Sequence, residues 1–103
     1  MAVVTTTLGS AQAAHTLAAT LVEERLAACV HVFPVTSRYR WEGEVRVDAE
    51  WRCEAKTARS RVEHLMARIA ELHTYDTPEV VVTAVEGGDA RYLAWVNDEV
   101  DGG

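Results

Sequence analysis

Cysteine, proline, aromatic residues and long apolar runs are all scarce in this sequence. The 103 residues include two cysteines and two prolines, and 7% are aromatic. Two cysteines are too few for a disulfide framework and match no paired zinc spacing, so we expect reduced thiols. No apolar stretch approaches the length of a membrane span, and Met1–Thr5 lacks the basic region and apolar run of a signal peptide. We therefore expect a cytoplasmic protein with no membrane partner.

Positive charge is scarce as well. Ten Lys and Arg residues stand against sixteen Asp and Glu residues, which gives a formal net charge of −6. A field of this sign repels phosphate backbones and attracts cations. RNA-binding modules that share the strand and helix order predicted below need positive charge and aromatic platforms for bases. We therefore expect no nucleic-acid partner.

The remaining composition is that of one globular domain. Apolar residues make up 49% of the chain and charged residues 25%, which is ordinary for such a domain. We expect a single domain over residues 1–103, which is large enough for a core but too small for a separate substrate domain. One active surface is the most that we expect.

The first third of the chain predicts a strand, a helix and a second strand. The β-branched run Val3–Thr6 is typical of a strand, and Ser10 can cap a helix that extends to about Leu26. Residues Ala28–Val35 return as a strand. Because Pro34 cannot donate a hydrogen bond to a neighbouring strand, it indicates the edge of a sheet or a bulge.

A long β-hairpin is predicted next. Alternation of apolar and polar residues continues to Trp41, Glu42–Glu44 turns the chain, and Val45–Ala55 runs back. The arm from Ala28 to the turn would reach about 50 Å when extended, whereas a compact chain of this size has a radius of gyration of about 13 Å. The hairpin must bend or project, and a projecting arm exposes apolar edge strand that proteins normally cover. We therefore expect a homo-oligomer.

The hairpin also predicts how the two cysteines are placed. With Gly43 at the tip, direct pairing puts Cys53 opposite Phe33 and Cys29 opposite Thr57. The two sulfur atoms then lie roughly 13 Å apart along the strands. That distance disfavours a disulfide.

The second half of the chain completes the fold. Thr57 or Ser60 can cap the next helix, and Ser60 with Glu63 forms a capping-box pattern before an apolar helical stripe that ends at Leu72. The apolar segment Glu79–Val85 predicts a central, covered strand, and a final helix follows Gly87–Asp89. The order β-α-β-β-α-β with an extra C-terminal helix is that of a ferredoxin-like α+β sandwich.

The connector after the second predicted helix is rich in proton-handling groups. It carries His73, Tyr75, Asp76 and Glu79, and Pro78 stiffens it. These side chains suit acid–base chemistry or cation binding, and they equally suit a structural loop that satisfies the end of a helix. The chain has no nucleophile motif, phosphate-cradling glycine loop or cofactor motif, so we expect binding or structure, and not an enzyme.

A second candidate lies on the strand before the hairpin turn. Cys29 and His31 are two residues apart, so a thiol and an imidazole share one strand face. This pair of soft and borderline ligands suits copper or zinc. The alternative is that Cys29 is a small core residue and His31 a polar residue at the edge.

Several motifs occur in a specific order along the chain. They are Leu21–Val30, Ser37–Gly43, Glu50 with Lys56–Thr57, His73–Glu79 and Tyr92–Trp95. In this order they strongly resemble the CutA divalent-cation tolerance family, over about Val3 to Val100. The resemblance implies a ferredoxin-like homotrimer whose hairpins and sheet edges associate between subunits, similar in architecture to the PII signalling proteins.

The resemblance also implies a function and a set of residues. CutA proteins are named for tolerance to divalent metals, chiefly copper, which implies binding of an ion such as Cu²⁺. The alternative is a PII-like regulator that takes a small-molecule ligand in a cleft between subunits, with Lys56 as the anion contact. By residue matching, Cys29 and His73 are the candidate metal ligands. The candidates for the intersubunit pocket are Trp41, Glu50, Lys56, Tyr75 and Asp76.

The sequence departs from the family pattern near these positions. It has His31 where the family usually has Asn, Thr74 in place of Pro, and Asp76 in place of Glu. Thr74 loosens the connector and Asp76 shortens the reach of the carboxylate. His31 adds a further candidate imidazole ligand beside Cys29.

Overall fold

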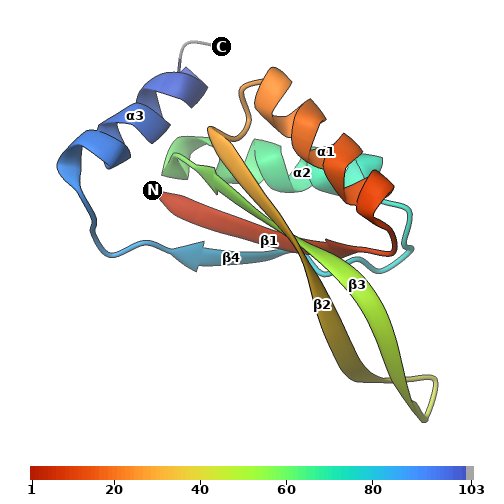
Figure 1. The fold of residues 1–103 in the computed structure, drawn as a ribbon. Helices are drawn as coiled ribbons and strands as arrows, with labels where there is room; N and C mark the ends of the chain where they lie inside the picture. The colour runs from red at the N-terminus through yellow and green to blue at the C-terminus, as the bar shows by residue number, and fades with distance from the viewer. Residues whose placement is uncertain (102–103) are drawn as a thin grey trace.

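Two helices cover one face of a four-stranded sheet, and a third helix lies at the end remote from a projecting hairpin (Figure 1). The computed structural model describes residues 1–101, so the last two residues of the predicted domain lie outside this description. The elements are β1 (Ala2–Leu8), α1 (Ala11–Glu23), β2 (Cys29–Trp41), β3 (Glu44–Thr57), a short 3₁₀ turn (Arg59–Arg61), α2 (Val62–Leu72), β4 (Val81–Ala84) and α3 (Ala90–Asp101).

The sheet has the order β2-β3-β1-β4, and every neighbouring pair is antiparallel. β1 and β2 therefore run in the same direction with β3 between them, which is the split βαβ arrangement. This topology confirms the predicted ferredoxin-like α+β fold. It also confirms that β2, which contains Pro34, is an edge strand.

The predicted cap of α1 is present. The Ser10 hydroxyl accepts a hydrogen bond from the backbone N–H of Ala13 at 3.1 Å. The helix ends at Glu23, before the predicted Leu26, and Arg25 then turns the chain with a positive φ of 58°. The turn brings the chain back to the sheet as β2.

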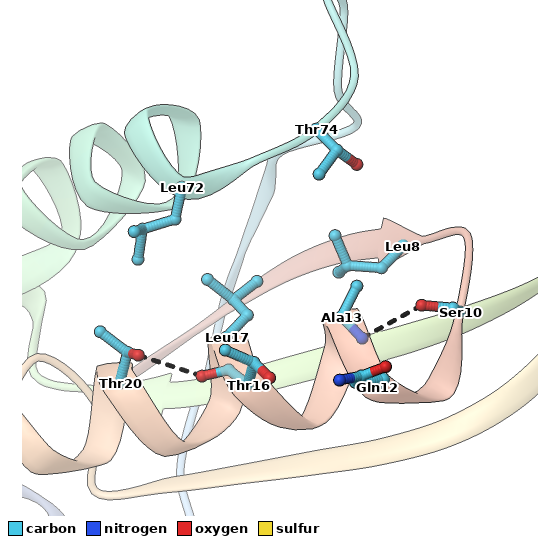
Figure 2. A pocket seen from close by; sticks show the side chains of 9 residues that line it. All are labelled: Leu8, Ser10, Gln12, Ala13, Thr16, Leu17, Thr20, Leu72 and Thr74. Atoms are coloured by element: carbon cyan, nitrogen blue, oxygen red, sulfur yellow. Dashed lines mark hydrogen bonds between the residues drawn. The ribbon is translucent and has the colours of Figure 1, made fainter.

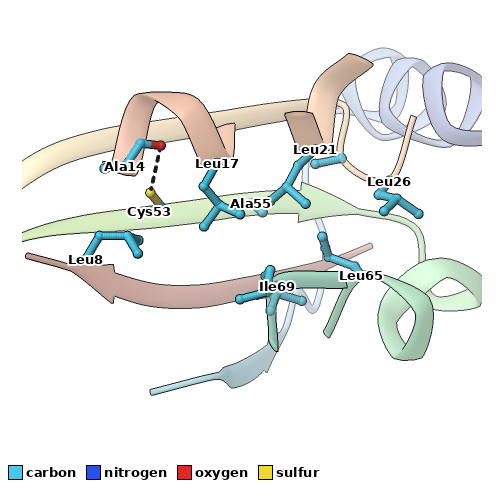
Figure 3. Close-up of a cluster of buried hydrophobic side chains, with 11 residues drawn as sticks. Leu8, Ala14, Leu17, Leu21, Leu26, Cys53, Ala55, Leu65 and Ile69 are labelled. Carbon is cyan, nitrogen blue, oxygen red and sulfur yellow. Dashed lines mark hydrogen bonds between the residues drawn. The ribbon is translucent and has the colours of Figure 1, made fainter. Parts of the chain in front are cut away.

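The core lies between the sheet and the helices α1 and α2 (Figure 3). Its buried side chains include Leu17 and Leu21 of α1, Leu65 and Ile69 of α2, Val4 of β1 and Ala55 of β3. At the surface, Arg68 of α2 donates to both carboxylate oxygens of Glu24 at 2.9 and 2.8 Å. A planar guanidinium matches a carboxylate in this two-bond geometry, so α2 is tied to the C-terminal end of α1.

Strand alternation gives the hairpin two different sides. Val30 and Val32 of β2 pack against the core and pair with Ala55 and Cys53 of β3. The residues between them point away from α1 and α2, because successive side chains alternate across a strand. We call this side the outer face. It carries Cys29, His31, Phe33, Val35, Ser37, Tyr39 and Trp41 of β2, and Glu44, Arg46, Asp48, Glu50, Arg52, Glu54 and Lys56 of β3.

The hairpin projects from the body, as predicted, and the molecule measures 45 × 25 × 21 Å (Figure 1). Its tip is the two-residue turn Glu42–Gly43, in which both residues have positive φ, as in the turns that match strand twist. The predicted tip at Gly43 alone is therefore wrong, and the register shifts by one residue. Cys29 pairs with Lys56 instead of Thr57, and both cysteines are free.

β4 is an edge strand, so the prediction of a central, covered strand is wrong. It pairs with β1 alone. Val82 packs against the core, whereas Val81 on the other side is 50% exposed. The apolar run indicates burial on both sides, but this chain covers one side.

α2 begins without the predicted capping box. A cap residue needs an extended backbone, and Ala58 occupies that place, with φ −80° and ψ 151°. Ser60 falls inside the 3₁₀ turn that follows, and no side chain caps either the turn or α2. The Ser60 and Glu63 prediction is therefore wrong, because the helix entry is displaced by one tight turn.

α3 is held at both ends. The Asp89 carboxylate accepts hydrogen bonds from two backbone N–H groups of its first turn, at 3.0 and 3.2 Å. At the other end, Arg25 donates to the Glu99 carbonyl at 2.8 Å and Arg61 to the Val100 carbonyl at 2.9 Å. Helix-terminal carbonyls lack partners within the helix, so the two arginines satisfy groups that would otherwise need water.

Candidate functional site

The candidate residues of the hairpin lie on one surface. Cys29, His31, Trp41, Glu50 and Lys56 all belong to the outer face. They extend from the tip, where Trp41 is 48% exposed, to the base, where Cys29 and Lys56 pair. α1 and α2 cover the other face of the sheet (Figure 1), and strand alternation places the charged side chains of β3 on the outer face.

His73 ends α2 and fastens the connector to β1. Its Nε2 lies 2.8 Å from the backbone oxygen of Thr7, and its Nδ1 lies 3.0 Å from the backbone N of Tyr75. A carbonyl oxygen accepts and a backbone N–H donates. Nε2 therefore carries the proton and Nδ1 supplies the lone pair, so both ring nitrogens of the neutral imidazole are in use.

Tyr75 reaches from the connector to the outer face. Its hydroxyl donates to Oε2 of Glu50 at 3.1 Å. β1 pairs with β3 as far as Trp51, so Glu50 is the next residue of β3 and the connector fills the place beside it. Burial and the Glu50 carboxylate raise the pKa of Tyr75 to about 12. Gly9 leaves room for this ring, because a Cβ there would lie 3.2 Å from the hydroxyl.

A second tyrosine and carboxylate pair, which sequence reasoning missed, lies farther along the hairpin. The Tyr39 hydroxyl donates to Asp48, and this bond raises the pKa of Tyr39. Carboxylates two residues apart on one strand share a face, and this spacing was the available signal. We call Tyr39, Asp48, Glu50 and Tyr75 the tyrosine–carboxylate cluster. The predicted Asp76 is exposed next to it in the chain.

Lys56 and His31 form a separate group at the base of the outer face. The Lys56 Nζ lies 3.4 Å from Nδ1 and 3.4 Å from Nε2 of His31. It also lies 5.8 Å from the centre of the Tyr92 ring on α3. Within residues 1–101 Lys56 makes no ion pair. This ammonium group is therefore available to an anion.

The predicted metal ligands Cys29 and His73 are not brought together within one chain. Cys29 pairs with Lys56, which pairs with Val3 at the start of β1, whereas His73 contacts Thr7 near its end. That separation is roughly 13 Å along the strand. In the described part of the chain, no group of three or more His, Cys, Asp or Glu side chains is arranged to hold a metal ion. One chain does not complete a metal site.

A groove between α1 and the end of α2 was not predicted (Figure 2). Its volume is about 350 Å³, and every residue that lines it is uncharged. Leu8, Leu17 and Leu72 supply apolar surface, and Thr16 and Thr74 supply polar groups. It gathers no acid, base or metal ligand, so it adds no chemistry to the outer face.

Comparison with known proteins gives consistent similarities. The family model of the CutA1 divalent ion tolerance protein matches residues 2–99. The divalent-cation tolerance protein CutA of Thermus thermophilus is 43% identical over 97 residues, covering 93% of this chain and 94% of that protein. The chloroplastic CutA 1 of rice is 38% identical, and the chain spans 55% of its length.

Solved structures agree in fold. CutA from Xylella fastidiosa has a TM-score of 0.94 at 35% identity, with 97% of each chain covered. The PII-like protein CutA from a Nostoc species, in apo form, has a TM-score of 0.92 at 37% identity, again with 97% of each chain covered. Among the described residues of the present chain, no helix has the length and apolar character needed to cross a membrane.

Proposed function

This chain belongs to the CutA1 divalent ion tolerance family, and on that premise we propose that it is a homotrimeric divalent-cation tolerance protein that binds ions such as Cu²⁺. The observation that carries the proposal is the similarity over almost the whole length to proteins named for this tolerance. The proposal assigns no catalysed reaction. It places the protein in the cytoplasm, where thiols stay reduced.

The open edges of the sheet support self-association. β2 and β4 are both edge strands, so each presents unpaired backbone groups. Apolar side chains are exposed on both edge strands, with Trp41 of β2 at 48% and Val81 of β4 at 50%, and near the hairpin tip on β3, with Val45 at 57%. Association through these edges would pair the backbone groups and cover the apolar side chains. Three copies are what the family relationship favours.

The donors of the outer face support metal binding between copies. Cys29 is half-buried and lies on the same face as His31, so a thiol and an imidazole are adjacent. Copper and zinc favour such ligands, and the net charge of −6 attracts cations. Because one chain offers too few donors in one place, we place the remaining ligands on a neighbouring copy or on water.

Isothermal titration with Cu²⁺ and with Zn²⁺ tests the proposal. We expect saturable binding that weakens at least tenfold in Cys29→Ala and in His31→Ala. The loss of one of a few ligands should cost at least about 1.4 kcal/mol of binding free energy, which corresponds to a tenfold change in affinity. His64→Ala is the matched control, because it removes an exposed imidazole from α2, which covers the opposite face of the sheet (Figure 1). The absence of saturable heat with both ions would refute metal binding.

A PII-like regulator is the second candidate, favoured by Lys56. Its ammonium group lies beside His31 and Tyr92 without an ion pair in the described chain, which suits an anionic small molecule. A thermal-shift screen of nucleotides and carboxylate metabolites would find it, because a ligand at a hundred times its Kd adds about 2.7 kcal/mol. The stabilisation should vanish in Lys56→Met and persist in Arg91→Met, whose side chain is 94% exposed on α3.

A further inference from the structure

We propose that His73 is the positioning residue of the tyrosine–carboxylate cluster and that it is not a metal ligand. The first half concerns hydrogen bonds within one chain. The claim that His73 is not a metal ligand rests on the proposed function, because it concerns which histidine binds the metal ion. His73 was predicted to bind metal, but we infer that it orients Tyr75 so that the Tyr75 hydroxyl donates to Glu50.

The two ring nitrogens carry the first step. A histidine binds a metal through a nitrogen with a free lone pair. In His73 the Nδ1 lone pair accepts the Tyr75 N–H at 3.0 Å, and Nε2–H donates to the Thr7 carbonyl at 2.8 Å. To free Nε2, the proton would have to move to Nδ1, where it would oppose the Tyr75 N–H. Metal binding at His73 therefore requires the connector to open.

The same two bonds determine where Tyr75 lies. The His73 and Tyr75 ring centres are 4.8 Å apart with an interplanar angle of 52°, within the usual range for aromatic pairs. The Tyr75 hydroxyl then meets Glu50 at 3.1 Å. One imidazole thus links the end of β1 to the hairpin. Without it, the Thr7 carbonyl loses a partner in a part-buried place, and the Tyr75 N–H loses one at an exposed place.

Amide variants separate the two bonds. In His73→Asn the amide oxygen can replace Nδ1 and accept the Tyr75 N–H. In His73→Gln the amide N–H can replace Nε2–H and donate to Thr7. His73→Ala supplies neither group. If His73 only fills space, His73→Asn and His73→Gln should preserve the position of Tyr75 equally well. If His73 positions Tyr75, His73→Asn should preserve that position better, because it keeps the bond to the Tyr75 N–H.

Spectrophotometric titration of the phenols reads out the position of Tyr75, and Tyr75→Phe identifies its step. We expect its midpoint to fall from about 12 toward about 10 in His73→Ala, because Tyr75 leaves Glu50 and becomes solvated. His73→Asn should restore most of the difference and His73→Gln less. Equal midpoints in the wild type and His73→Ala would overturn the inference.

Zn²⁺ titration followed by ¹⁵N NMR of the imidazole rings tests the second half. The chain has four histidines, which single replacements assign. We expect His73 to show the Nε2–H tautomer before and after Zn²⁺, while His31 responds to the ion. A His73 that shifts in step with His31 would overturn the inference and leave metal binding standing. If neither Zn²⁺ nor Cu²⁺ binds, the proposed function fails, and the phenol titration still decides whether His73 positions Tyr75.

Discussion

At the scale of single residues, the two thiols differ because one of them is covered. Cys53 is 1% exposed beneath α1, with its Sγ 3.7 Å from the Ala14 carbonyl (Figure 3). Burial raises the pKa of Cys53 to about 11. Cys29 is half-buried on the outer face. Because the thiolate is the reactive form, only Cys29 suits metal binding or labelling at neutral pH.

We predict that a thiol-specific disulfide reagent at about pH 8 labels Cys29 and spares Cys53 in the native protein. Cys29→Ser should abolish this labelling, and Cys53→Ala should preserve it. In Cys29→Ser, labelling of Cys53 should then accelerate about tenfold per pH unit up to its pKa, because the thiolate fraction rises by that factor. Thiol counting before and after unfolding checks this. Equal labelling of both thiols at pH 8 would contradict the burial argument.

The residues of the candidate functional site were partly predictable from the sequence. The connector with His73 and Tyr75 stood out because polar groups are dense there. Its contact with Glu50 depends on where β1 ends beside β3, which is a property of strand pairing and not of local composition. The bond between Tyr39 and Asp48 was missed for the same reason. Residue types indicate chemistry, whereas their partners depend on register.

At the scale of elements, the two predicted helix caps provide a matched test. Ser10 accepts a backbone N–H at the start of α1, whereas Ser60 caps no helix. We predict that Ser10→Ala lowers the free energy of unfolding by about 1 kcal/mol. Ser60→Ala should change it by less than about 0.5 kcal/mol, as an exposed residue without a defined bond. Urea unfolding of the two variants gives the comparison, and a larger loss in Ser60→Ala would contradict it.

The existence of the elements was predictable, and their pairing was less so. Hydrophobic periodicity predicted every strand and helix, and Pro34 indicated the edge position of β2. The register was mispredicted by one residue because the alternation within each arm does not determine which faces of the two arms meet; the length of the turn does, and it shows in the positive φ of Glu42 and Gly43. The position of β4 was mispredicted because an apolar run does not distinguish a central strand from an edge strand that has one covered face.

At the scale of the whole molecule, the folded chain is more extended than a compact domain with the same number of residues. The radius of gyration is 14.2 Å, against about 13 Å for such a domain. The excess lies in the hairpin, which extends beyond α1 and α2 (Figure 1). Its apolar side chains are only partly covered within the described chain, with Val45 57% and Val47 50% exposed. This shape is compatible with the association between copies that we propose.

We predict a solution mass of about three times the 11.3 kDa chain mass at micromolar concentration, measured by light scattering after gel filtration. Val45→Glu should weaken association by more than about tenfold, because an unpaired carboxylate is costly to bury. Arg91→Ala, which removes a 94% exposed side chain of α3, should leave the mass unchanged. A wild-type protein with the mass of one chain would contradict the proposed assembly.

The anchoring of α3 also determines how freely its sequence can vary. Arg25 and Arg61 hold its last turn through backbone carbonyls, which are present whatever side chains the helix carries. Arg91, whose side chain is 94% exposed, makes none of these bonds, whereas Tyr92 of the same helix lies against Lys56. Mutations can accumulate on the side of Arg91 while the helix keeps its place. The exposed polar side of the last helix is therefore where substitutions carry the least risk to the fold, whereas Val96 and Val100 on its other side are buried.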